Sequence, residues 1–126
     1  MNREELAWAA GLFDGEGSIG LYSAGRAQRW KHLRLAVGQS DTEVLIRFNA
    51  AVGGLGKLTG PYKGSKNTKK PQFMLTFNGF ERCQAVVAFM WQWLSSPKRN
   101  QCRFGLGEAI AYYKTVRKIV RKIKRG

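Results

Sequence analysis

The chain has 126 residues, 44% of them hydrophobic, and its 22 Lys and Arg against 8 Asp and Glu give a formal net charge of +14. This length suits one domain with one core, and the hydrophobic content excludes a basic disordered tail. So large a positive charge costs stability by self-repulsion unless a polyanion neutralises it. We therefore predict a single domain over residues 1–126 whose first partner is nucleic acid, with an anionic membrane surface second.

Cysteine and histidine are scarce. The single His32 and the two cysteines, Cys83 and Cys102, do not have the spacing of a zinc site. Both cysteines fall in predicted helices, which favours reduced, buried thiols over a disulfide. The chain begins with charged residues and has no apolar run approaching about 18 residues. We therefore expect a soluble protein of the cytoplasm or of an organelle interior, with no signal peptide.

Residues 3–14 predict a helix that is apolar on every side after its first turn. A helix without a polar face must be covered all round. One side can meet the core of its own domain, and the other carries small residues that let another backbone approach closely. We therefore expect a symmetric homodimer in which this helix crosses its copy at Ala7, Ala10 and Gly11.

Four segments alternate between apolar and polar side chains, which is the period of a half-buried strand. They are residues 18–23, 33–39, 57–62 and 72–77. The first two flank a basic loop, and the last two flank a loop with four lysines. Each pair therefore predicts a hairpin with a cationic connection.

Three further helices complete the predicted elements. Ser40 and Glu43 form a capping box for a helix that ends near Val52. Asn78 is the expected cap of a helix over 79–94, and Ser96 with Pro97 opens a last helix that is basic at its end. The order predicts an α+β fold in which helices cover one face of a four-stranded antiparallel sheet. The other face is polar and basic, and it suits nucleic acid.

One motif is more specific than these patterns. Residues 9–19, Ala-Ala-Gly-Leu-Phe-Asp-Gly-Glu-Gly-Ser-Ile, form a small-residue helix that runs through D-G-E-G directly into a strand. This segment resembles the signature of the LAGLIDADG homing endonucleases in its G-E-G variant. The predicted element order is similar to the αββαββα core of that family over nearly the whole chain. Further similarity lies at Gln39, at the Gly-rich turn after the second helix and at residues 98–101.

The resemblance implies a function. A single motif per chain corresponds to the homodimeric members, which are intron-encoded, site-specific double-strand DNA endonucleases with long, near-palindromic targets. The implied cofactor is Mg²⁺, with Mn²⁺ as a substitute and Ca²⁺ supporting binding without cleavage. The implied partners are double-stranded DNA and a second copy, with no membrane and no small-molecule substrate.

The resemblance also implies site residues. The final acid of the motif, Glu16, binds the divalent cation, with Gly15 beside it at the metal. Glu16 lies at a helix C-terminus, where the negative end of the dipole assists cation binding, and hard carboxylate oxygens suit Mg²⁺. We expect Asp14 to stabilise the turn instead. Gln39 is the second catalytic candidate, and an ordinary amide at the end of a strand is the alternative interpretation.

One position departs from the family pattern. Many members carry a lysine just after the fourth strand, and this sequence has Asn78 and Gly79 there. The auxiliary basic role is therefore unassigned, and Lys98 and Arg47 are the alternatives.

The DNA contacts are predicted from the strand alternation and the cationic loops. Outward side chains of the strands, helped by two loop arginines, are expected in the major groove: Tyr22, Arg26, Arg29, His32, Arg34, Thr59, Gln72, Met74 and Thr76. Loop lysines are expected at phosphates: Lys63, Lys66, Lys69 and Lys70. Arg34 is the expected reader of guanine.

Two other functions compete with the endonuclease. A non-catalytic nucleic-acid-binding protein on the same fold, either an intron RNA maturase or a DNA-binding regulator, would use the same basic sheet. Retention of Glu16 favours the enzyme. General packaging of nucleic acid fits poorly, because the chain is strongly apolar and contains an acidic motif.

Overall fold

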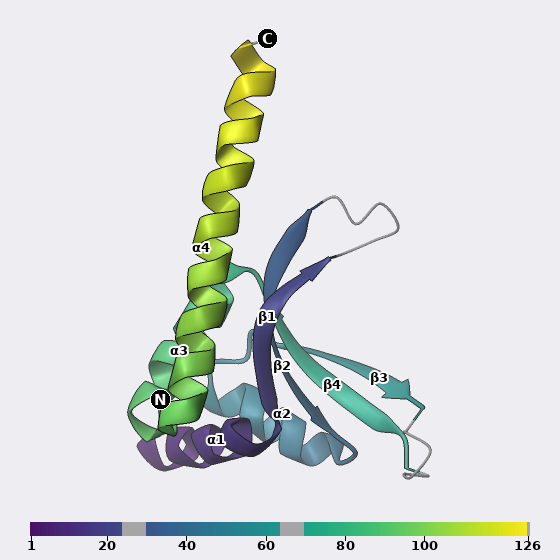
Figure 1. Cartoon of the computed structure of the whole chain (residues 1–126). Coiled ribbons are helices and arrows are strands. Elements are labelled where there is room, and N and C mark those ends of the chain that lie inside the picture. The colour runs from purple at the N-terminus through teal and green to yellow at the C-terminus, as the bar shows by residue number, and fades with distance from the viewer. Residues whose placement is uncertain (24–29, 64–69, 126) are drawn as a thin grey trace.

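The computed structural model describes residues 1–23, 30–63 and 70–125. Its helices and strands follow the predicted order (Figure 1). They are α1 (Arg3–Glu16), β1 (Gly17–Ser23), β2 (Lys31–Gln39), α2 (Thr42–Ala51), β3 (Lys57–Tyr62), β4 (Gln72–Asn78), α3 (Phe80–Met90), the 3₁₀ turn η1 (Trp91–Trp93) and α4 (Ser96–Arg125). The α+β class is confirmed.

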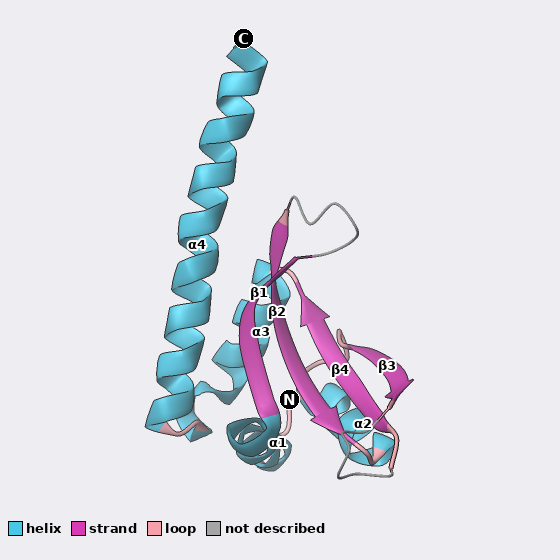
Figure 2. Cartoon of the chain, turned by 45° about the vertical axis from the view of Figure 1, so that its right-hand side comes forward, coloured by secondary structure: helices cyan, strands magenta, loops and turns pink. Residues whose placement is uncertain are grey.

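The four strands form one antiparallel sheet in the order β1-β2-β4-β3. The register pairs Gly17 with Val37 between β1 and β2, and Leu35 with Phe77 between β2 and β4. Helices lie on one face of this sheet, and its other face is open (Figures 1 and 2). The two central strands therefore carry the core on one side and the polar surface on the other.

The core lies between the sheet and the helices. Leu33, Leu35 and Val37 alternate along β2 and are fully buried, as the period of two requires. From the helical side, Phe48 of α2 meets Phe77 of β4 edge to face, with ring centroids 6.2 Å apart. This layer fixes which face of the sheet is left for a partner.

The helix caps differ from the prediction. The side chain of Asp41, not Ser40, caps α2 by accepting a hydrogen bond from the Glu43 N–H at 2.9 Å. At α4 the hydroxyl of Ser95, not Ser96, accepts from the Lys98 N–H at 3.3 Å. In both places two neighbouring polar residues compete, and the tertiary path of the chain decides between them.

The expected cap of α3 is also wrong. Gly79, with φ of +98°, occupies the N-cap position, and no side chain caps this helix. Asn78 instead faces the open side of the sheet, where its side chain bonds Arg34 and Thr76. The helix is also shorter than predicted, because it ends at Met90 and the chain continues as η1.

The two sides of α1 have different surroundings. Leu6, Ala10 and Phe13 share one face and are buried in the core of the chain itself. Ala10 is 0% exposed, so the prediction that it contacts a second copy is wrong. Ala7 is half-buried, and Gly11 is exposed, with no described atom beyond the local helix backbone within 4 Å of the place where its Cβ would lie. Only these two of the three predicted positions offer surface to a partner.

The last helix, α4, has 30 residues and runs beside β1 before it projects beyond the body of the fold (Figure 1). The Tyr112 hydroxyl accepts from the backbone N–H of Lys31 at 2.7 Å, and the Tyr113 hydroxyl accepts from that of Leu33 at 3.3 Å. These bonds anchor the middle of α4 to β2. Among the described residues, no helix combines the length and the apolar character needed to cross a membrane.

Candidate active site and nucleic-acid interface

Glu16 is the last residue of α1 and is exposed. Its carboxylate accepts no hydrogen bond from any residue that the structure describes. A helix C-terminus places the negative end of the helix dipole beside this group, which favours a cation there. Glu16 is therefore available to an external ligand.

The two glycines that flank Glu16, Gly15 and Gly17, differ in what a side chain would meet at each position. The N–H of Gly17 bonds to the Phe13 carbonyl and closes the helix. A Cβ at Gly17 would collide with the Phe13 ring, whereas the place of a Cβ at Gly15 has no heavy atom within 4 Å. Gly17 thus lets the chain turn over Phe13 into β1, and Gly15 leaves open space next to Glu16.

Asp14 is already engaged. Its carboxylate accepts hydrogen bonds from the backbone N–H and the hydroxyl of Ser95, both at 3.1 Å. These bonds hold the start of α4 against the end of α1. Asp14 therefore stabilises the turn before α4, 81 residues away in sequence, and not the turn of its own motif as predicted.

Lys98 reaches this end of α1 from the first turn of α4. Its side chain is almost fully buried, with a relative exposure of 7%. The Nζ atom donates to the Gly17 carbonyl at 2.9 Å and to Oε1 of Gln101 at 3.0 Å, and it lies 5.3 Å from the centroid of the Phe13 ring. Lys98 thus fixes the carbonyl of Gly17, the residue that directly follows Glu16.

Arg47, the other candidate for the basic role, lies elsewhere. Its guanidinium forms an ion pair with Glu5 at 2.8 Å and stacks 3.8 Å above the Trp8 ring. The hydrogen bond to Arg47 lowers the pKa of the Glu5 carboxyl. Glu5 precedes Glu16 by eleven residues in α1, which is about 16 Å along the helix axis. Arg47 therefore joins α1 to α2 and does not face the candidate site.

Gln39 is the last residue of β2 and is half-buried. Because Gly17 pairs with Val37, the antiparallel register carries Gln39 past the start of β1. Gln39 therefore lies at the same end of the sheet as Glu16.

The donors at this end suit a hard cation but do not complete its shell. Within residues 1–23, 30–63 and 70–125, no three His, Cys, Asp or Glu side chains gather closely enough to hold a metal ion. Mg²⁺ binds through one or two carboxylates and takes its other oxygens from phosphate and water. One exposed carboxylate per chain therefore fits Mg²⁺ when substrate phosphates supply the rest of the shell.

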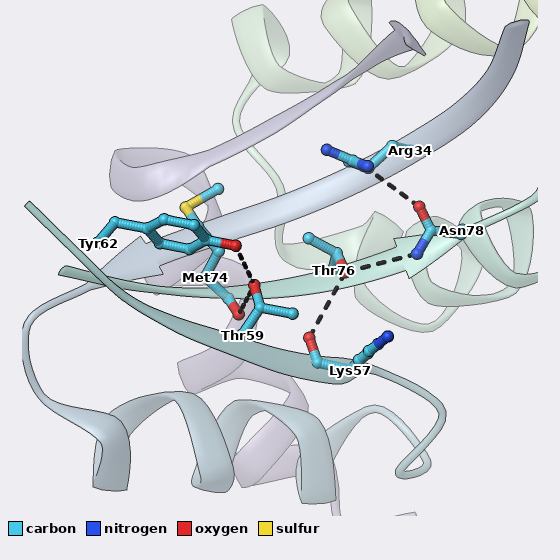
Figure 3. A pocket seen from close by; sticks show the side chains of 7 residues that line it. All are labelled: Arg34, Lys57, Thr59, Tyr62, Met74, Thr76 and Asn78. Atoms are coloured by element: carbon cyan, nitrogen blue, oxygen red, sulfur yellow. Dashed lines mark hydrogen bonds between the residues drawn. The ribbon is translucent and has the colours of Figure 1, made fainter. Parts of the chain in front are cut away.

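The open face of the sheet is hollowed (Figure 3). A cavity of about 440 Å³ lies over β2, β3 and β4 and is lined by Arg34, Lys57, Thr59, Tyr62, Met74, Thr76 and Asn78. Four of these were predicted from the strand alternation: Arg34, Thr59, Met74 and Thr76. The sheet therefore brings together predicted DNA contacts from three strands.

Three residues of the hollow were missed by sequence reasoning. Lys57 and Asn78 continue the alternation of Thr59 and Thr76 by one step, so extending the pattern would have found them. Tyr62 is three residues after Thr59, so strict alternation would place the two side chains on opposite faces of the sheet. A register shift between these two residues turns Tyr62 to the same face as Thr59. That irregularity has no signature in the alternation.

The remaining predicted contacts lie around the hollow or outside the described residues. Tyr22 and His32 are paired across β1 and β2, and Gln72 is paired with Tyr62. Lys63 and Lys70 are exposed beyond the ends of β3 and β4. The other four predicted contacts fall outside the described residues: Arg26, Arg29, Lys66 and Lys69.

Comparisons with known proteins bear on the fold. No protein-family model and no curated protein matches the sequence. Among solved structures, homing endonuclease I-CvuI in complex with its target in the presence of 2 mM Ca matches with a TM-score of 0.67 and 21% identity, covering 90% of this chain and 70% of I-CvuI. The group I intron-encoded homing endonuclease I-CeuI, complexed with DNA, matches with a TM-score of 0.64 and 15% identity, covering 90% of this chain and 57% of I-CeuI.

A third structure carries the family name itself. The LAGLIDADG meganuclease I-AabMI, bound to uncleaved DNA, matches with a TM-score of 0.59 and 16% identity, covering 98% of this chain and 38% of I-AabMI. At such identities the likeness establishes architecture and not activity. The chain thus has the fold of the LAGLIDADG homing endonucleases over nearly its whole length.

Proposed function

We propose that this protein is a site-specific double-strand DNA endonuclease that depends on a divalent metal ion and acts as a homodimer. The observation that carries the proposal is the exposed Glu16 carboxylate at the C-terminus of α1, at one end of an open sheet face. The likeness to DNA-bound homing endonucleases supports the same assignment.

Glu16, with Gly15 beside it, would hold the cation. A bound Mg²⁺ would supply Lewis-acid stabilisation of charge at the phosphodiester. Lys98 holds the Gly17 carbonyl and thereby keeps the end of α1 in place. Gln39, at the same end of the sheet, is the second residue proposed to face the scissile phosphate.

The open face would bind DNA in the major groove, since a two-stranded ribbon or a curved sheet can present side chains to base edges there. Side chains of the hollow would contact bases, and Lys63 and Lys70 would contact phosphates. I-CvuI is seen in complex with its target in the presence of 2 mM Ca. We propose that Ca²⁺ supports binding without cleavage by this chain. Mn²⁺ would substitute for Mg²⁺.

A plasmid library with a randomised, near-palindromic insert tests this function. Incubation with Mg²⁺ or Mn²⁺ should linearise a small subset of plasmids that share one motif, and incubation with Ca²⁺ or a chelator should linearise none. The same library bound in Ca²⁺ reports binding separately. Tight selection of one site without cleavage in any metal would overturn the endonuclease and favour a DNA-binding regulator. Selection of structured RNA over DNA would favour a maturase.

A further inference from the structure

The Arg34 guanidinium is held from two sides on the open face of the sheet. Its Nε donates to Oδ1 of Asn78 at 3.2 Å, across the directly paired positions of β2 and β4. Its Cζ atom lies 4.8 Å from the centroid of the Tyr22 ring, a cation–π contact. An arginine held in this way has lost most of its rotamer freedom before any ligand arrives.

The orientation of Asn78 is fixed in turn. Its Nδ2 donates to the Thr76 hydroxyl at 3.4 Å, and that hydroxyl donates to the Lys57 carbonyl at 3.5 Å (Figure 3). Because the Lys57 carbonyl can only accept, the Thr76 proton points to it and leaves a lone pair for the Asn78 amide. The chain of bonds therefore has one direction, and it aims Oδ1 of Asn78 at Arg34.

This arrangement leaves a specific part of Arg34 for recognition. With Nε occupied, the two Nη groups at the far end of the guanidinium donate no hydrogen bond to any described residue, and that end points away from Asn78 (Figure 3). Two adjacent donors match two adjacent acceptors, and in the major groove only guanine offers that pair, at N7 and O6. Adenine presents a donor beside its N7, and thymine presents one acceptor.

We propose that Asn78 is a positioning residue that locks Arg34 as a reader of guanine, so that the target carries one invariant guanine at the same place in each half-site. This proposal rests on the proposed function, because it requires that the open face binds DNA. It assigns Asn78 a role in specificity that acts entirely through Arg34. Tyr22 contributes through its ring and not through its hydroxyl.

Lysines at the edge of the same face provide a contrast. Lys63 and Lys70 are exposed at the ends of β3 and β4, and no hydrogen bond among the described residues holds their amino groups. Such side chains suit phosphates, which lie at varying positions and need only charge. The fixed Arg34 suits a base edge, whose acceptors have one geometry.

The test is a binding selection from randomised DNA in Ca²⁺, which reports base preference without cleavage. The wild type should select guanine at one position per half-site, and Arg34→Ala should erase that preference. Asn78→Ala should reduce the preference for guanine over adenine at that position roughly tenfold, within the range of one bidentate contact. The double variant should show the same base preferences as Arg34→Ala alone, because Asn78 is proposed to contact no base directly.

Two controls separate positioning from damage to the fold. Tyr22→Phe keeps the ring over Arg34 and should keep the preference for guanine at that position. Tyr22→Ala removes the ring and should weaken the preference. Thr115→Val alters the exposed surface of α4, outside the hollow, and should leave the preference for guanine unchanged. Thermal unfolding of each variant confirms that it is folded.

The outcomes are distinguishable. If Asn78→Ala relaxes a position other than that relaxed by Arg34→Ala, Asn78 reads its own base and the inference is wrong while the endonuclease proposal stands. The inference also fails if Arg34→Ala weakens binding to all sequences equally, since Arg34 then contacts phosphate. If the wild type selects no sequence at all, the open face is not a DNA reader and both proposals fall.

Discussion

Lys98 stands out among the charged residues because it is almost completely buried and donates to the carbonyl of Gly17, the residue after Glu16. A buried ammonium is tolerated only when its donors are used, and here two hydrogen bonds and an aromatic face receive it. Its position links the first turn of α4 to the last turn of α1. The geometry therefore favours Lys98, and not Arg47, for the auxiliary basic role near the candidate metal site.

Lys98→Met tests that role, since it keeps the length of the side chain and removes the hydrogen bonds. We expect the single-turnover cleavage rate to fall about 10- to 100-fold, the usual effect of losing a group that orients a metal ligand. The dissociation constant for the target in Ca²⁺ should change little. Lys118→Met, at an exposed lysine of α4, is the matched control and should cut normally. Equal losses in binding and cleavage would show that Lys98 supports only the fold.

The two cysteines lie in the core and should be unreactive. Burial raises the pKa of both thiols, Cys83 and Cys102, from 9.0 to about 11. Since the thiolate is the reactive form, a disulfide reagent at pH 8 should label neither cysteine in the folded protein and both in guanidinium chloride. Fast labelling of the native protein would contradict this burial.

The same shift has a consequence for stability. Between pH 9 and pH 11 the unfolded chain releases thiol protons that the folded chain retains. The free energy of unfolding should therefore be constant below pH 9 with respect to these groups and fall as the pH rises through that window.

At the level of elements, α1 has one side that no other described element of the chain covers. Gly11 is exposed and has open space around it, and Ala7 lies one turn before it. Small residues four apart let two helix backbones approach closely, and the interior face of α1 is already filled by Leu6, Ala10 and Phe13. A second copy of α1 is therefore the proposed cover.

Gly11→Leu should abolish dimerisation by separating the two helices. Because no described residue outside the local backbone of α1 lies within 4 Å of that Cβ, the folded monomer should tolerate the larger side chain. Sedimentation velocity at micromolar concentration should show a dimer for the wild type and a monomer for the variant. Gly107→Leu changes another exposed helical glycine with open surroundings and should remain dimeric. A monomeric wild type would exclude the proposed dimer in the absence of DNA.

The helices and strands were largely predictable from the sequence, because the repeat of apolar side chains that identifies each of them lies within a short segment. Alternation along 33–39 identified Leu33, Leu35 and Val37 as core, and the structure buries all three. The caps were not predictable in the same way. The choice between Ser40 and Asp41 depends on the path of the chain into α2, and the use of Asn78 depends on its partner Arg34 in another strand.

The candidate site was predictable only in part. Glu16 follows from a contiguous motif, so the sequence alone was sufficient to select it. Lys98 reaches Gly17 across 81 residues, and Tyr62 joins the hollow through a register shift. Both facts are tertiary, and no spacing in the sequence encodes them.

The whole molecule is cationic, and its binding to DNA should depend strongly on salt. Lys63 is an expected phosphate contact at the end of β3. Lys63→Gln should weaken binding to every sequence alike and reduce the slope of log affinity against log salt by about two, one for each protomer of the proposed dimer. Arg82→Gln removes an exposed cation on α3, on the covered side of the sheet, and should leave the slope unchanged. A loss confined to one base position would make Lys63 a base contact.

Each chain offers one exposed carboxylate at the C-terminus of α1, Glu16, and two chains are needed to cut two strands. Glu16→Gln keeps the shape of that side chain and removes its charge, so the open sheet face is untouched. Single-turnover cleavage of the selected site in Mg²⁺ is the direct measurement, with Glu108→Gln as the control at an exposed acid of α4. We expect Glu16→Gln to lose cleavage by several orders of magnitude while it binds the site in Ca²⁺ as tightly as the wild type, and Glu108→Gln to cut normally. Cleavage by Glu16→Gln at a rate near that of the wild type would contradict the account.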